Sequence, residues 1–225
     1  MSNLKIFSNH IAVSDKRIIV RLDLNVPISN SKVGDDTRIK VVEPLINELI
    51  KNKAKVILLT HLGRPKGTVV PELSLKPIFN YLKERLKGKI YFYEGKIDNK
   101  TIDASKKLKS GEILLIENIR FFKEEESDEE NFAKNLAKLG DLFVNEAFSC
   151  SHRDHASVSQ ITRYIKSYAG INLALELEAL KKITSEITNP ITCIIGGSKI
   201  STKIKIIRNL ITKFNNIIIV GAMAN

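Results

Sequence analysis

The sequence has little cysteine, no long apolar run and no basic arm. Its two cysteines, Cys150 and Cys193, cannot form a disulfide framework, and neither has another Cys or a His at metal-ligand spacing. The longest apolar runs, such as residues 56–59 and 217–220, are too short to span a bilayer, and residues 1–10 lack the apolar segment of a signal peptide. We therefore expect a soluble, cytoplasmic protein with free thiols.

The formal charge of +11 comes from 36 Lys and Arg residues set against 25 Asp and Glu residues. These cations are scattered and interleaved with acids, and no basic run is flanked by aromatic residues, so we expect neither a nucleic-acid partner nor a membrane partner. The dense acidic run at residues 123–130 is best explained as the solvated start of a helix, and not as a metal site.

Short β-branched runs alternate with longer stretches of helical period, which predicts an α/β fold with a Rossmann-like parallel sheet flanked by helices. The predicted strands are residues 17–22, 55–60, 90–93, 113–117, 142–145, 192–195 and 217–220. The predicted helices are residues 36–52, 75–87, 101–108, 128–139, 157–165, 172–184 and 201–214.

A long amphipathic helix followed by Asn189-Pro190, a new strand and a glycine turn predicts a domain boundary. We expect a first domain at residues 1–169, an interdomain helix at 170–188 and the truncated start of a second, similar domain at 189–225. Two parallel strands do not make a stable domain alone, so the rest of the second domain is supplied elsewhere or the chain is a fragment.

Basic loops follow four of the predicted strands, at residues 21–25, 61–65, 117–120 and 152–157. In open parallel sheets ligands bind at the carboxyl ends of the strands, and Arg and His side chains there suit an anion. The sequence therefore predicts a pocket for a small polyanion.

Several of these loop residues allow two interpretations. Asp23 and Asn25 could hold ligand hydroxyls or orient an arginine, or they could merely stabilise a turn. Arg38 lies in a first helical turn, where a cation opposes the helix dipole; this favours a ligand over a surface salt bridge with Asp35 or Asp36.

The loop at residues 61–67 combines His61, Gly63 and Arg64, and this combination favours carboxylate or phosphate binding over a purely structural histidine. His152 and His155 could share a helix face and a metal ion, but Arg153 between them would repel a cation. Anion binding by Arg153 is the better explanation.

Residues 196–203, Gly-Gly-Ser-Lys-Ile-Ser-Thr-Lys, lie between a predicted strand and a predicted helix, where glycine-rich turns bind phosphates. The segment is neither a Walker A motif nor a Gly-x-Gly-x-x-Gly fingerprint. Lys199 and Lys203, four residues apart, would project toward a polyphosphate, which favours nucleotide phosphate binding.

Taken together, these segments resemble the phosphoglycerate kinase family, in unbroken order from about residue 17 to residue 225. The segments that carry the resemblance are Arg-Leu-Asp-Leu-Asn-Val-Pro at 21–27, Asp-Asp-Thr-Arg-Ile at 35–39, Lys-Val-Ile-Leu-Leu-Thr-His-Leu-Gly-Arg-Pro-Lys-Gly at 55–67, Ser-Leu-Lys-Pro at 74–77, Glu-Asn-Ile-Arg-Phe at 117–121, Leu-Phe-Val-Asn-Glu-Ala-Phe at 142–148, His-Arg-Asp-His-Ala-Ser at 152–157, Glu-Leu-Glu-Ala-Leu at 176–180 and the glycine-rich segment at 196–203.

The resemblance implies reversible phosphoryl transfer between 1,3-bisphosphoglycerate and ADP, giving 3-phosphoglycerate and ATP in glycolysis, with Mg²⁺ bound to the nucleotide and no metal site in this chain. It implies two Rossmann-like domains and a monomer at full length. The residues implied to bind 3-phosphoglycerate are Asp23, Asn25, Arg38, His61, Leu62, Gly63, Arg64, Arg120 and Arg153. Gly196, Gly197 and Lys203 are implied to bind the nucleotide, and Arg38 and Lys199 to be catalytic.

Two positions depart from the family pattern, which usually has Asp at Glu146 and a small residue at Asp154, where the extra charge adjoins Arg153. The chain also ends where the family continues for about as many residues again. We therefore expect the chain alone to be inactive; the alternative is a non-catalytic anion-binding module that retains only the substrate pocket.

Overall fold

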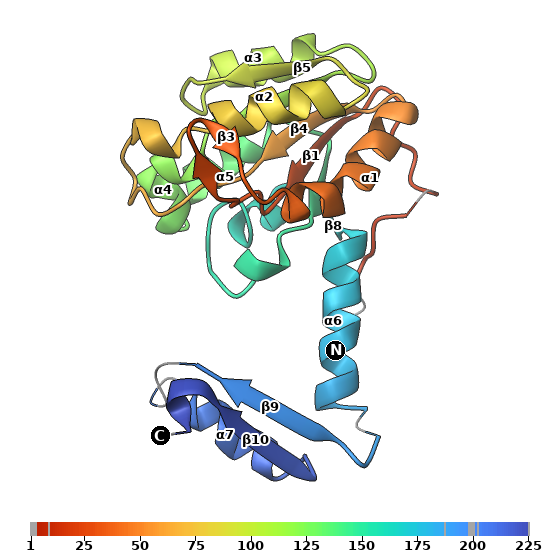
Figure 1. Cartoon of the computed structure of the whole chain (residues 1–225). Coiled ribbons are helices and arrows are strands. Elements are labelled where there is room, and N and C mark those ends of the chain that lie inside the picture. Colours follow the sequence, from red (N-terminus) through yellow and green to blue (C-terminus); the bar gives the residue numbers. More distant parts are fainter. Residues whose placement is uncertain (1–3, 9, 187, 198–200, 202, 225) are drawn as a thin grey trace. The chain divides into compact units, whose positions relative to one another are not determined.

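The computed structural model describes all residues except 1–3, 9, 187, 198–200, 202 and 225 (Figure 1). The chain divides into two compact units, Met1–Ala174 and Leu175–Asn225, and the division falls within one helix. The predicted domain boundaries, with an interdomain helix at residues 170–188, stay a prediction. None of the helices among the described residues is both long enough and apolar enough to cross a membrane.

The first unit contains a six-stranded sheet in the order β5-β6-β4-β1-β7-β8, and every neighbouring pair is parallel. This order places β1 and β4 in the centre of the sheet, where both faces are covered. The strands are β1 (Arg17–Arg21), β4 (Lys55–Leu59), β5 (Ile90–Tyr93), β6 (Ile113–Ile116), β7 (Leu142–Asn145) and β8 (Ser167–Ala169).

Helices cover both faces of this sheet. On one face, Ile18 and Val20 of β1 pack in a cluster with α1 (Thr37–Lys51) and α2 (Lys76–Arg85). On the other face, Ile19 packs with residues of α3 (Asn99–Lys107) and α5 (Glu130–Ala137). Successive side chains of a strand point to opposite faces of the sheet. The continuous apolar strands therefore contribute side chains to two separate hydrophobic cores, one on each face.

Shorter elements complete the first unit. A hairpin pairs β2 (Ile28–Ser29) with β3 (Lys32–Val33), and α4 (Lys123–Glu126) precedes α5. Five 3₁₀ helices lie entirely within the described residues. They are Pro71–Leu73, Ile119–Phe121, Phe148–Cys150, Gln160–Arg163 and, in the second unit, Gly221–Met223.

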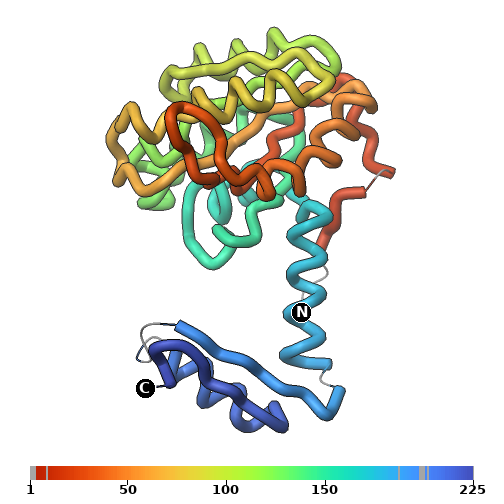
Figure 2. Tube along the Cα trace, in the orientation of Figure 1, coloured from red at the N-terminus to blue at the C-terminus, as the bar shows by residue number. Residues whose placement is uncertain are grey.

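The second unit consists of the end of α6 (Ile171–Thr184), β9 (Thr192–Gly196), α7 (Ile204–Ile211) and β10 (Asn216–Val220), whose trace is seen in Figure 2. The two strands are parallel neighbours. No residue of α7 is buried.

The parallel α/β class predicted from the sequence is confirmed, with the seven predicted strands and six of the seven predicted helices present. The helix predicted at residues 157–165 is wrong, since only Gln160–Arg163 form a 3₁₀ turn. Three consecutive residues, Ala156, Ser157 and Val158, are buried there, which an amphipathic surface helix cannot accommodate. The sequence reading also missed β8 and the β2–β3 hairpin.

Candidate functional site

A small cavity lies at the carboxyl-end loops of the central strands in the first unit. Its volume is about 240 Å³. It collects side chains that follow β1, β4, β6 and β7, as the strand-end argument predicts. The lining residues are Asp23, Asn25, Arg38, His61, Gly63, Arg64, Arg120, Ser149, Cys150 and Arg153. Four guanidinium groups therefore face one carboxylate, an arrangement suited to an anion.

Asp23 anchors one wall of the cavity. Its carboxylate forms an ion pair with Arg38 and accepts hydrogen bonds from the Ser149 hydroxyl and the Asn25 backbone N–H. Burial alone would raise the pKa of Asp23, but these hydrogen bonds and the charge of Arg38 bring that pKa below its ordinary value. Asp23 is therefore ionised, and it orients Arg38 from the start of α1.

The partner of Arg38 differs from the alternative that the sequence left open. Asp35 accepts hydrogen bonds from Thr37, and Asp36 pairs with Lys40 and accepts from Tyr81. The described ion pair of Arg38 is the one with Asp23 at the cavity.

Gly63 joins two sides of the cavity through its backbone. Its N–H donates to Asn25 Oδ1 at 2.9 Å, and its carbonyl accepts from Arg120 Nη1 at 3.0 Å. Its φ of +62° lies in the left-handed region, and a Cβ there would come within 2.6 Å of Leu73. Only glycine fits this turn without strain.

His61 follows β4 and is almost completely buried. Burial, together with the charges of Arg21 and Arg120, lowers the pKa of His61 to about 2, against an opposing effect of Asp23. The imidazole is therefore neutral near pH 7 and can offer one directional N–H without adding charge.

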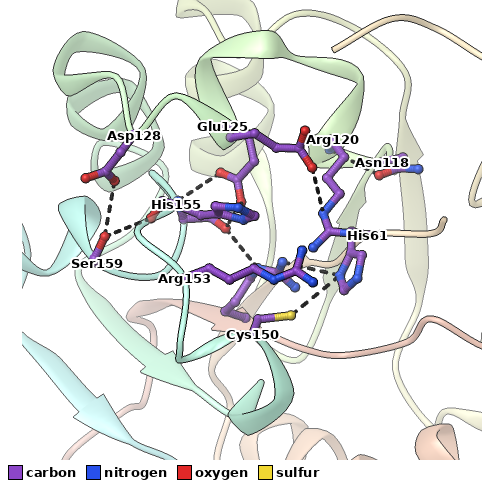
Figure 3. Close-up of polar contacts among 12 residues, drawn as sticks. His61, Asn118, Arg120, Glu125, Asp128, Cys150, Arg153, His155 and Ser159 are labelled. Carbon is purple, nitrogen blue, oxygen red and sulfur yellow. Dashed lines mark hydrogen bonds and ion pairs between the residues drawn. The ribbon is translucent and has the colours of Figure 1, made fainter. Parts of the chain in front are cut away.

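Arg120 is the most buried of the four arginines of the cavity, with only 3% of its surface exposed. Its Nε lies 3.6 Å from a Glu126 carboxylate oxygen and has no hydrogen-bond partner among the described residues (Figure 3). Arg64 is exposed and Arg153 is half-buried. Arg120 Nε–H is therefore a buried donor beside Glu126 without a hydrogen-bond partner among the described residues, although buried donors normally have partners.

The structure brings together every predicted residue of the substrate pocket; Leu62 is buried between His61 and Gly63 and does not itself line the cavity. The sequence reading missed Ser149 and Cys150, which line the cavity from the 3₁₀ helix after β7. Their place just beyond a strand end was the available signal. Arg21, which is fully buried and lies close to His61, was counted in a basic strand-end loop but not among the residues implied to bind 3-phosphoglycerate.

The predicted nucleotide residues lie in the second unit. Gly196 ends β9, Gly197 has a φ of +155°, and Lys203 immediately precedes α7. The catalytic candidate Lys199 lies outside the described residues. This part of the predicted site stays a prediction.

The two departures from the family pattern have different surroundings. Glu146 is buried, and it accepts hydrogen bonds from the backbone N–H groups of Asn172 and Leu173 in the first turn of α6. Burial raises the pKa of Glu146 against these hydrogen bonds. Asp154 is exposed and forms none of the ion pairs found among the described residues. Glu146 is therefore a cap of α6 and not a ligand of the cavity.

A larger hollow in the first unit, about 670 Å³, is lined by three phenylalanines and by Glu94, Glu117, Glu124 and Glu129. These carboxylates would repel a phosphate or a carboxylate. The smaller arginine-lined cavity is therefore the candidate anion site.

Comparison with known proteins identifies the family. The sequence model described as phosphoglycerate kinase matches residues 8–225. The chain belongs to the phosphoglycerate kinase family. The phosphoglycerate kinase of Bartonella bacilliformis is 48% identical over 217 residues, which are 96% of this chain and 54% of that protein. That of Rhizobium meliloti is 45% identical over 213 residues, covering 95% of this chain and 53% of the relative.

Solved structures of phosphoglycerate kinases have the same fold. The enzyme from Coxiella burnetii matches with a TM-score of 0.84 at 36% identity, over 98% of this chain and 56% of that one. The enzyme from Pyrococcus horikoshii matches with a TM-score of 0.85 at 28% identity and the same coverage. The chain thus spans about half the length of the phosphoglycerate kinases that it matches.

Proposed function

We propose that this chain provides the 3-phosphoglycerate-binding part of a phosphoglycerate kinase. The reaction is reversible phosphoryl transfer between 1,3-bisphosphoglycerate and ADP, giving 3-phosphoglycerate and ATP, with a carboxyl group as acceptor. The observation that carries the proposal is the cavity with four arginines in a chain of this family. Family membership favours this kinase over the non-catalytic anion-binding module.

The chemistry of 3-phosphoglycerate fits the lining of the cavity. The molecule carries a phosphate and a carboxylate, and the planar guanidinium forks of Arg38, Arg64, Arg120 and Arg153 can bind either group with paired hydrogen bonds. Asp23 and Asn25 offer acceptors for the hydroxyl between these two groups. The neutral His61 adds a donor, Gly63 completes this wall, and Leu62 is proposed to support it from behind.

The catalytic requirement is neutralisation of charge and positioning, because phosphoryl transfer involves little covalent participation by the protein. Arg38 is proposed to stabilise the transferring group together with Lys199. Gly196, Gly197 and Lys203 are proposed to bind nucleotide phosphates. Mg²⁺ is proposed to enter with ADP or ATP, where it would neutralise charge on the phosphate oxygens.

We further propose a glycolytic protein of the cytoplasm that is a monomer at full length, with no nucleic-acid or membrane partner. Since the chain spans about half the length of its relatives, ligand binding is the property to measure first.

Calorimetric titration of the purified chain with 3-phosphoglycerate tests the proposal. We expect binding by the wild-type chain and a loss of most of it in Arg38→Ala, because a charge-assisted hydrogen bond contributes about 1.5–3 kcal/mol. Arg163→Ala, which removes an exposed arginine outside the cavity, is the matched control and should bind as the wild type does.

Two results would contradict the proposed function. One is the absence of 3-phosphoglycerate binding by the folded wild-type chain. The other is equal loss of affinity in Arg38→Ala and Arg163→Ala, which would indicate attraction by net charge alone.

A further inference from the structure

A chain of buried polar contacts connects Glu125, through Ser157 and Arg21, to the cavity-lining residue His61; Figure 3 labels the two ends of this chain, Glu125 and His61. It begins at Glu125, which is fully buried in the middle of the acidic segment of α4. The Glu125 carboxylate accepts two hydrogen bonds from one residue, the Ser157 N–H at 2.9 Å and the Ser157 hydroxyl at 2.6 Å. Burying a carboxylate is costly unless its oxygens are hydrogen-bonded, so these two hydrogen bonds indicate a specific role for Glu125.

The Ser157 hydroxyl connects Glu125 to Arg21 by two hydrogen bonds. Its Oγ accepts from Arg21 Nε at 2.8 Å while donating to Glu125 Oε1. A hydroxyl has a single proton and a guanidinium can only donate, so the direction of both hydrogen bonds is fixed. Both residues are fully buried, which leaves water little access to reverse the arrangement.

Arg21 in turn meets His61. Its Nη1 donates to the Leu22 carbonyl, and its Nη2 lies 3.4 Å from His61 Nδ1. Because the guanidinium has no acceptor, this contact is a hydrogen bond only if His61 Nδ1 carries the lone pair. The proton of the neutral ring is then on Nε2.

We propose that Glu125 and Ser157 are positioning residues that act through Arg21 to fix His61 as the Nε2–H tautomer, so that Nε2–H donates to the anion in the cavity. This inference rests on the proposed function for the identity of that anion. If Nε2 is directed at the anion, as this proposal requires, the other tautomer would present a lone pair to that anion, and a protonated ring would bring its Nδ1–H against Arg21.

The surroundings of His61 support a neutral ring. Arg21 from β1, Arg120 from the 3₁₀ helix after β6 and Arg153 from the loop after β7 all oppose a positive charge on it, and Asp23 favours one. The Cys150 thiol lies 4.0 Å from Nδ1, on the same side as Arg21. Burial has the largest effect in lowering the pKa of His61 and the arginines add to it, so the ring remains neutral across the physiological pH range.

Long-range ¹H–¹⁵N spectra of the full chain with ¹⁵N-labelled histidine test the inference, with His61→Asn used to assign the ring signals. In the wild type we expect an unprotonated Nδ1 and a protonated Nε2 from pH 5 to pH 8. In Ser157→Ala and in Glu125→Gln we expect a mixture of tautomers, together with an affinity for 3-phosphoglycerate that is lower by about tenfold.

Two further variants separate positioning from general stability. Ser157→Thr keeps the hydroxyl and should retain the wild-type tautomer. Ser159→Ala is the matched control, because the Ser159 hydroxyl bonds to Asp128 and to the His155 carbonyl and lies outside the chain of contacts to Arg21. It should change neither the tautomer nor the affinity.

The outcomes distinguish this inference from the proposed function. A protonated Nδ1 in the wild type would overturn the inference whether or not 3-phosphoglycerate binds. An unchanged tautomer and an unchanged affinity in both Ser157→Ala and Glu125→Gln would overturn it as well. The expected tautomer in a wild-type chain that does not bind 3-phosphoglycerate would overturn the proposed function, and with it the donation to that ligand. If Ser157→Ala does not fold, the wild-type spectrum and Glu125→Gln decide.

Discussion

Strands β4 and β10 have similar apolar sequences, but their side chains are buried to different extents in the two units. In the first unit β4 reads Lys-Val-Ile-Leu-Leu, and its four apolar side chains are fully buried. In the second unit β10 reads Asn-Ile-Ile-Ile-Val, yet Ile218 is 47% exposed and Val220 41% exposed. An apolar run predicts a strand in both units, but burial depends on the layers that cover the strand.

The largest expected effect tests this difference with the same substitution in both units. Ile57→Ala in β4 should lower the free energy of unfolding of the first unit by about 2–5 kcal/mol, because it opens a cavity in a closed core. Ile218→Ala in β10 should cost the second unit about 1 kcal/mol or less, since half of the side chain already meets solvent.

Urea unfolding followed by tyrosine fluorescence measures the Ile57→Ala effect, because all five tyrosines lie in the first unit. Backbone amide signals of β10 report on Ile218→Ala. Equal destabilisation by the two substitutions would show that the burial contrast does not control stability.

The second prediction assigns ligand binding to the first unit. Arg64→Ala should weaken 3-phosphoglycerate binding by about 1.5–3 kcal/mol, because it removes a charge-assisted contact from the cavity. Lys203→Ala removes a cation of the second unit and should leave this affinity unchanged. Calorimetric titration of both variants is the measurement; a comparable loss in Lys203→Ala would mean that 3-phosphoglycerate binding is not confined to the cavity.

The third prediction concerns pH and again separates the units, because all four histidines lie in the first. The pKa of His61 is lowered from 6.5 to about 2, so below pH 6.5 the unfolded chain binds a proton that the folded chain excludes. The stability of the first unit should therefore fall as pH decreases from 6.5, with a contribution from His61 that approaches about 1.4 kcal/mol per pH unit.

Urea titrations between pH 7 and pH 5 measure this dependence. His61→Gln should make it shallower, whereas His10→Gln, which alters an exposed histidine, should not. An unchanged slope in His61→Gln would mean that His61 is protonated in the folded chain.

The smallest expected effect should be the same in both units. Lys134 pairs with Glu130 in α5, and Lys182 pairs with Glu178 in α6; both pairs are exposed and spaced i, i+4. Lys134→Ala and Lys182→Ala should each cost about 0.3–0.5 kcal/mol. Thermal unfolding at low and high salt checks this, and a large difference between the two variants would imply that the units differ in more than burial.

Strands β1, β4, β6 and β7 could be predicted from the sequence because covered parallel strands have continuous apolar runs, whereas the three-residue β8 could not. The turn at residues 156–158 could not, because its conformation depends on Glu125, which is distant in the sequence and enters through the hydrogen bonds to Ser157. A local pattern carries no signal of such a contact.

Some contacts of the cavity could likewise be predicted from the sequence, and others could not. Arg64, Arg120 and Arg153 could be proposed because cations after strands indicate an anion site, and Arg38 because a cation in a first helical turn opposes the helix dipole. The contact between Arg21 and His61 could not, because the pattern at residues 21–25 places a cation at the strand end but does not indicate that its side chain is buried against a distant histidine. A buried arginine is recognised only when its partners are known.

The contacts of Gly63 also constrain how this protein can evolve. Its backbone forms hydrogen bonds with the side chains of both Asn25 and Arg120, and Leu73 occupies the space that a side chain at position 63 would need. A smaller residue at position 73 would have to arise before any side chain at position 63 could fit, and the positive φ would still oppose it. Substitutions at these four positions should therefore show strong epistasis, with their effects depending on the order in which they occur.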